Sequence, residues 1–155
     1  MKNNSLKEIA GKISEAKSIM LFPHVNPDGD ALGSCAALCK ALRKLGKETW
    51  VLLEDDIPAN LRFLDKGYCT WDSAKIEEPD ICMCVDCGSS DRFEKRAEKF
   101  ASGKTTICID HHRTSELKWA YNYIDPAEAA TGQIVFELLR ELGAEPDKEI
   151  GEAIF

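Results

Sequence analysis

The histidines and several aspartates of this chain stand in three short stretches, each directly after an apolar run. The runs are residues 19–22, 81–85 and 105–109, and the polar residues that follow them are His24, Asp28, Asp30, Asp86, Asp110, His111 and His112. Carboxylates mixed with imidazoles suit manganese, magnesium, cobalt or ferrous iron, whereas a structural zinc site favours thiolates. The residue types therefore predict a site for one of these divalent cations.

The number of candidate ligands predicts more than one ion. His24, Asp28, Asp30, Asp86 and His111 are too many for a single ion that keeps a position open for substrate. Two ions about 3.5–4 Å apart, bridged by a carboxylate and a water, are the natural arrangement, and such a pair activates water and holds a phosphoryl group. The chain has no Walker-type glycine loop and no G-x-S-x-G motif, so the favoured chemistry is metal-assisted phosphoester hydrolysis.

The first stretch lies between a predicted strand and a predicted helix. Residues 26–29, Asn-Pro-Asp-Gly, have the composition of a type I turn, and Asp30 is placed where a helix N-cap belongs. Gly33 and Ser34 are small enough to let the helix lie close to the sheet, and its N-terminus can help to hold a phosphate. A capped surface turn is the simpler interpretation, but it does not explain why His24 and an aspartate flank the same turn.

The elements that must position these residues alternate along the chain. Strands are predicted at residues 19–22, 50–53, 81–85, 105–109 and 119–124, the last at an edge, and helices at 5–17, 31–45, 91–101, 129–142 and from Pro146 to the end. A short packing helix is predicted at 58–64, and residues 68–78 are expected to be irregular. This alternation predicts an α/β fold: a mostly parallel sheet of about five strands with helices on both faces. The carboxyl ends of such strands share one edge, so the three polar stretches should converge there.

Composition narrows the class of protein. The 155 residues predict one domain, with no apolar run of membrane-spanning length and no signal peptide, which favours a cytoplasmic protein without a membrane partner. The net charge of −7 argues against binding a long duplex, while bound metals can supply local positive charge for small phosphates. The seven cysteines lie mostly in apolar segments and are expected to be reduced. A thiolate or redox site at Cys84-x-x-Cys87 remains the weaker alternative.

Three motifs together resemble the DHH phosphoesterase family. They are His24-x-Asn26-Pro27-Asp28-Gly29-Asp30-Ala31-x-Gly33-Ser34, then Val85-Asp86, then Asp110-His111-His112. The order of the motifs and their places after strands make the resemblance specific, and it covers essentially the whole chain. The first motif is most similar to the nanoRNase/pAp-phosphatase (bifunctional oligoribonuclease and PAP phosphatase) branch. The resemblance implies hydrolysis of short single-stranded RNA, of the 3′-phosphate of pAp, or of both.

The resemblance also implies a role for each residue. It implies that His24 and Asp28 bind one metal, that Asp30 and His111 bind the other, and that Asp86 bridges them. Asp110 is implied to orient the site and His112 to face the substrate phosphate, with two Mn²⁺, or alternatively Mg²⁺ or Co²⁺, as cofactors.

The chain departs from the family pattern at its end. The family has a fourth, Asp-Thr-Gly-like motif after a segment like residues 151–155, followed by a second, substrate-binding domain. We therefore expect residues 1–155 to be a DHH catalytic domain cut before both, and weakly active by itself. A cyclic-dinucleotide phosphodiesterase, an inorganic pyrophosphatase and a non-catalytic metal- or nucleotide-binding module are the alternatives, and homodimer formation is left open.

Overall fold

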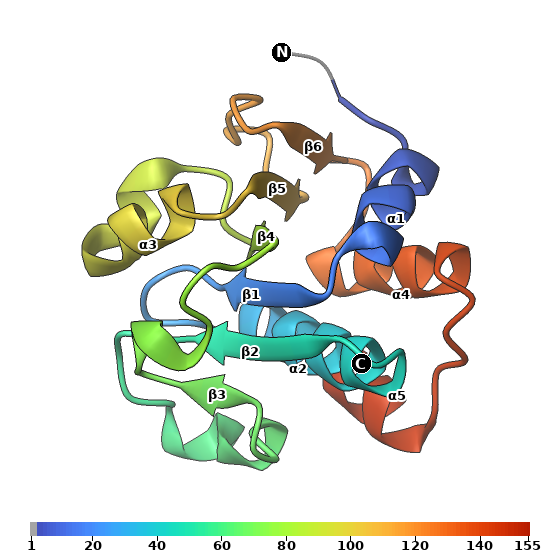
Figure 1. Cartoon of the computed structure of the whole chain (residues 1–155). Coiled ribbons are helices and arrows are strands. Elements are labelled where there is room, and N and C mark those ends of the chain that lie inside the picture. The colour runs from blue at the N-terminus through green and yellow to red at the C-terminus, as the bar shows by residue number, and fades with distance from the viewer. Residues whose placement is uncertain (1–2) are drawn as a thin grey trace.

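The computed structural model describes residues 3–155, which form a six-stranded sheet with helices on both faces (Figure 1). Every pairing is parallel, and the strand order is β3-β2-β1-β4-β5-β6. The strands are β1 (Ser18–Phe22), β2 (Glu48–Leu52), β3 (Cys69–Thr70), β4 (Ile81–Val85), β5 (Thr105–Asp110) and β6 (Tyr121–Ile124). The predicted fold class is confirmed, and β6 is an edge strand as predicted. The other edge strand, β3, was not predicted and lies in the segment expected to be irregular. Two residues are too few to show a strand pattern in the sequence.

The helices divide unequally between the two faces of the sheet. One face carries α1 (Leu6–Glu15), α2 (Gly29–Lys44), α4 (Thr131–Glu141) and α5 (Lys148–Ile154), and the other carries α3 (Ala97–Ala101) (Figure 1). Short 3-10 helices complete the chain: η1 (Ala59–Leu64), η2 (Ser73–Lys75), η3 (Ser90–Arg92) and η4 (Glu94–Arg96). The larger core lies under the four helices, and a second core with Phe22, Phe93 and Phe100 lies under α3. Among residues 3–155, no helix has both the length and the apolar character needed to cross a bilayer.

The single helix predicted over residues 91–101 is wrong: this segment is built from η3, η4 and α3. Phe93 and Arg96, three residues apart, are both buried. Arg96 N donates to Phe93 O over 2.9 Å, an i to i+3 hydrogen bond of the 3-10 type, so this turn is tighter than that of an α-helix. Phe93 stacks on Phe100 with ring centroids 4.5 Å apart, and Arg96 Nε donates to Glu54 Oε1 over 2.7 Å. These contacts between residues distant in the chain hold the tight turn in place, and the sequence pattern of the segment does not reveal them.

The entry to α2 also differs from the prediction. Asp28, not Asp30, is the N-cap, and its Oδ1 accepts a 2.9 Å hydrogen bond from Ala31 N. Asp28 has φ −89° and ψ −174°, so residues 26–29 are not a type I turn, which needs ψ near 0° at that position. The chain bends instead at Asn26, whose φ of 51° is left-handed and whose amide donates to Asp55 Oδ2. Asparagine tolerates that conformation.

Gly33 permits close packing against a neighbour other than the expected one. A Cβ at Gly33 would lie 2.1 Å from the carbonyl oxygen of Ala153 on α5, so the absence of a side chain lets α5 pack on α2. The sequence predicts close packing of this position on the sheet and misses α5, because a small residue does not indicate which distant element packs against it.

Candidate metal centre

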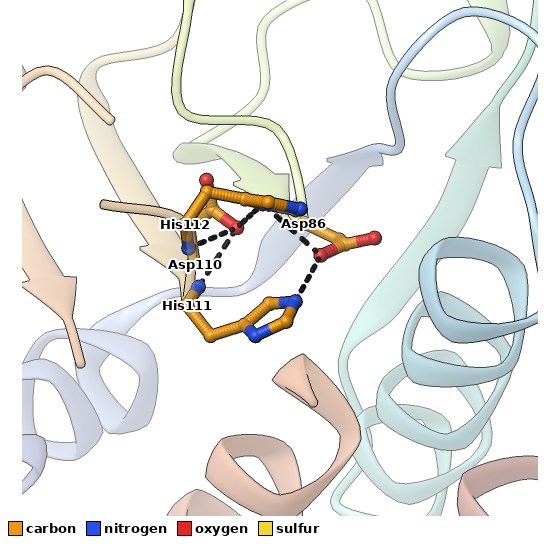
Figure 2. Close-up of side chains that lie close together, drawn as sticks. All are labelled: Asp86, Asp110, His111 and His112. Carbon is orange, nitrogen blue, oxygen red and sulfur yellow. Dashed lines mark hydrogen bonds and ion pairs between the residues drawn. The ribbon is translucent and has the colours of Figure 1, made fainter. Parts of the chain in front are cut away.

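The three polar stretches meet at the carboxyl edge of β1, β4 and β5. These strands are neighbours in the sheet, so the loops that follow them are brought together. Figure 2 shows Asp86, Asp110, His111 and His112 with their side chains turned toward one another. His24 and Asp28 approach Asp86 from the loop after β1, and Asp30 approaches His111 from the first turn of α2. The structure thus gathers all seven residues singled out from the sequence.

Asp86 lies at the centre of this group and is almost fully buried. Its backbone has φ 60°, a left-handed conformation that is strained for a residue with a side chain and often marks a functional position. One carboxylate oxygen, Oδ2, lies 3.8 Å from His24 Nε2, and the other, Oδ1, lies 3.6 Å from His111 Nε2. The two oxygens of one carboxylate therefore face two different histidines.

The spacing of these atoms fits metal ligation better than hydrogen bonding. His24 Nε2 lies 3.7 Å from Asp28 Oδ1, and His111 Nε2 lies 3.5 Å from Asp30 Oδ2. Such distances exceed those of good hydrogen bonds. Two atoms that each lie about 2.1 Å from a shared cation are about 3–4 Å apart, which is the separation seen here. The donor set, oxygens with two imidazoles, suits a hard or borderline divalent cation.

Both histidines are oriented by their other ring nitrogen. His24 Nδ1 lies 2.6 Å from the carbonyl oxygen of Val25, and His111 Nδ1 lies 3.3 Å from that of Glu128. A carbonyl only accepts, so each Nδ1 carries the proton, and each Nε2 presents a lone pair to the site. Ligating histidines in metalloproteins are commonly fixed by a hydrogen bond of this kind.

Asp110 is buried and has both carboxylate oxygens engaged. Its Oδ1 accepts from His111 N at 2.8 Å and from His112 Nδ1 at 2.7 Å, and its Oδ2 accepts from the hydroxyl of Ser115. Gly88 leaves room for this contact, since a Cβ there would lie 2.6 Å from Asp110 Oδ2. Asp110 is thus occupied in holding the loop that carries the histidines.

His112 differs from the other two histidines because it is half exposed and bound to a carboxylate. Partial burial lowers its pKa, but the hydrogen bond and charge of Asp110 outweigh this and raise the pKa of His112 above its ordinary value. The Nδ1 contact with Asp110 leaves Nε2 as the nitrogen available to a ligand. His112 is therefore suited to carry positive charge beside an anion.

Sequence reasoning missed Thr131 and Ser115. Thr131 begins α4, and its hydroxyl donates to Asp86 Oδ1 over 2.9 Å, while Ser115 holds Asp110. One signal was available: Thr131 and Gly132 lie in the first turn of the helix predicted at 129–142, and the amides at a helix start that lack a partner within the helix bind carboxylates. Nothing in the sequence indicated which carboxylate that would be.

The cysteine alternative finds no support in residues 3–155. Neither group of side chains that could hold a metal contains a cysteine, and all seven thiols are free. Burial raises the pKa of Cys87 to about 12 and that of Cys84 well above its ordinary value. Thiols that stay protonated are poor nucleophiles and poor ligands, so these cysteines act as small apolar core residues.

Comparison with known proteins identifies the family of this chain. Residues 18–155 match the DHH family, N-terminal domain. The bifunctional oligoribonuclease and PAP phosphatase NrnA of Thermus thermophilus is 37% identical over 139 residues, which cover 88% of this chain and 40% of that protein. A probable manganese-dependent inorganic pyrophosphatase of Streptococcus agalactiae is 26% identical over 145 residues, covering 85% of this chain and 44% of that protein.

Among solved structures, an exopolyphosphatase-related protein from Bacteroides fragilis superimposes with a TM-score of 0.87 at 26% identity, covering 96% of this chain and 47% of that one. The chain spans less than half the length of each of these proteins. The match over residues 18–155 covers most of the chain and includes every side chain of the candidate metal centre, so the chain belongs to the DHH family.

Proposed function

We propose that this chain is the metal-binding catalytic domain of a two-metal phosphoesterase that hydrolyses short oligoribonucleotides, the 3′-phosphate of pAp, or both. The observation that carries the proposal is the position of Asp86, one of whose carboxylate oxygens faces His24 while the other faces His111. Similarity to NrnA supports the substrate class. Similarity to a manganese-dependent pyrophosphatase supports Mn²⁺ as the metal.

In this proposal the two ions have separate ligands and share one. His24 and Asp28 hold the first ion, Asp30 and His111 hold the second, and Asp86 bridges the two. When bound, the pair supplies an activated water and neutralises the charge of the phosphoryl group.

The remaining side chains act on the substrate and on each other. Asp110 fixes the ring of His112, and the raised pKa of His112 favours the positively charged form of a ring that faces the substrate phosphate. The burial of Asp86 and Asp110 keeps water away from the contacts that set this geometry, so the groups need little rearrangement on binding.

An inorganic pyrophosphatase is the second candidate, favoured by the similarity to the streptococcal protein. Both candidates need the same metal pair and differ in what flanks the phosphoryl group: a nucleoside in one case and a second phosphate in the other. A substrate comparison therefore separates them without any change to the site.

The test is a substrate panel with Mn²⁺, run on this chain. The panel contains di- to pentaribonucleotides, pAp and pyrophosphate, and the variants are Asp86→Asn and the control Asp72→Asn, an exposed cap of η2. We expect hydrolysis of short RNA or pAp that needs Mn²⁺, is lost in Asp86→Asn and is kept in the control. Preference for pyrophosphate would favour the second candidate. Mn²⁺ uptake without any hydrolysis would indicate a binding module, and full activity in Asp86→Asn would refute the two-metal assignment.

A further inference from the structure

Thr131 contacts two of the proposed metal ligands from a single position. It is fully buried at the start of α4, and its hydroxyl donates to Asp86 Oδ1 over 2.9 Å. Its backbone amide donates to Asp30 Oδ2 over 3.0 Å, and the next amide, of Gly132, donates to Asp30 Oδ1 over 2.9 Å. The first turn of α4 thus holds Asp86 through a side chain and Asp30 through the backbone.

The hydroxyl contact determines how the Asp86 carboxylate is rotated. The last torsion of an aspartate side chain has broad, shallow preferences, so the orientation of the carboxylate depends on its hydrogen-bond partners. With Oδ1 held by Thr131, Oδ1 faces His111 and Oδ2 faces His24. Among the side chains that the structure describes, only that of Thr131 has a hydrogen bond of ordinary length to this carboxylate.

The backbone contacts of α4 reduce the repulsion between two neighbouring negative charges. Asp30 and Asp86 are both carboxylates, and the first turn of α4 contacts both, so two negative charges lie close together when both groups are ionised. The amides at the start of this 11-residue helix have no partner within the helix. They carry partial positive charge and stabilise a carboxylate placed there. At Gly132 a Cβ would lie 3.2 Å from the carbonyl oxygen of Ile154, so glycine suits the tight packing that brings these amides to Asp30.

We propose that Thr131 is a positioning residue that holds the Asp86 carboxylate in its bridging orientation and couples it to Asp30 through the first turn of α4. The inference rests on the proposed two-metal function and adds to it the residue that prepares one metal position before any ion binds. The position formed by Asp30, Asp86 and His111 is built by α4, whereas Asp28 of the other position is an exposed helix cap.

The test separates the hydroxyl of Thr131 from the rest of its side chain. Thr131→Val removes the hydroxyl and keeps the shape and the backbone amide, while Thr131→Ser keeps the hydroxyl. Thr49→Val is the matched control, because Thr49 is also a buried threonine whose hydroxyl is hydrogen-bonded, to Lys47 O, but it lies on β2 away from the site. Melting of the metal-free proteins checks that each variant folds.

Calorimetry with Mn²⁺ alone and electron paramagnetic resonance of the loaded proteins supply the readouts. Loss of a residue that orients a metal ligand typically weakens metal binding by about 10–100-fold. We expect Thr131→Val to weaken Mn²⁺ binding by that factor and to reduce the spin coupling between the two ions, whereas Thr131→Ser and Thr49→Val behave like the wild type.

The outcomes separate this inference from the proposed function. If the wild type binds two Mn²⁺ and Asp86→Asn does not, but Thr131→Val has unchanged affinity and spin coupling, the role of Thr131 is refuted and the two-metal function stands. Thr131→Ser as weak as Thr131→Val would also refute it, because the hydroxyl would then not be the cause. A wild-type chain that binds no Mn²⁺ overturns both.

Discussion

At the scale of single residues, Asp86 combines burial, a strained backbone and a shared position between two histidines. Burial, aided by the nearby charge of Asp30, raises the pKa of Asp86 from its ordinary 3.8 to about 7 in the metal-free protein. The hydrogen bond from Thr131 lowers it but does not cancel the shift. The carboxylate that is best placed to bridge two cations is therefore unfavourable in charged form without them.

This shift predicts the pH dependence of stability without metal. The folded state keeps a proton on Asp86 up to about pH 7, while the unfolded chain loses it near pH 4, so the contribution of this group to stability declines as the pH rises across that window. We expect the unfolding free energy of the wild type to fall relative to that of Asp86→Asn, which cannot titrate there. Denaturant unfolding in the presence of a chelator measures this, and parallel pH curves for the two proteins would contradict it.

At the scale of elements, the start of α2 serves two purposes at once. Asp28 caps the helix through its contact with Ala31 N, and its other role, in the proposed function, is to hold a metal with His24. A substitution can separate the capping role of Asp28 from its proposed role as a metal ligand, since asparagine caps a helix about as well as aspartate but has no charge.

We therefore predict different effects for two substitutions of Asp28. Asp28→Ala should lower the unfolding free energy of the metal-free protein by about 1 kcal/mol, while Asp28→Asn should leave it nearly unchanged. Both should weaken Mn²⁺ binding. Ser5→Ala is the control: it removes the cap of α1, which accepts from Glu8 N, and should cost a similar amount of stability without altering Mn²⁺ affinity. Unfolding curves and calorimetry decide the matter, and wild-type Mn²⁺ affinity in Asp28→Asn would show that Asp28 is a cap alone.

At the scale of the whole molecule, the chain has a net charge of −7, and its candidate metal centre is itself rich in carboxylates. Long single strands need a positively charged track along which successive phosphates can bind. In the proposed function, bound cations at the carboxyl edge of the sheet would provide positive charge at one point only. The charge distribution thus favours substrates with few phosphates.

This predicts a dependence on substrate length. This chain should hydrolyse di- to pentaribonucleotides with a higher kcat/KM than a long single strand, because the additional phosphates of the long strand meet a protein of net negative charge. Rates measured side by side at one ionic strength test the prediction. Equal kcat/KM values on both substrates would instead indicate an exonuclease that binds along a strand.

The sequence by itself determined the fold class and the residues that meet at the site. Continuous apolar strands such as β4 and β5 are buried on both faces of a parallel sheet, and polar residues directly after them must lie at its carboxyl edge. These are local patterns combined with a general rule of topology, so no knowledge of distant contacts is needed.

Only the tertiary structure decided which partners each of these residues has. Thr131 is 101 residues from Asp30 and 45 residues from Asp86, and the left-handed backbone of Asp86 has no local signature. Asp28 is the cap of α2, whereas Asp30 lies inside the first turn of that helix, and its carboxylate is held by backbone amides of α4. The orientation of a ligand depends on hydrogen bonds between elements far apart in the chain, and these exist only once the helices have packed on the sheet.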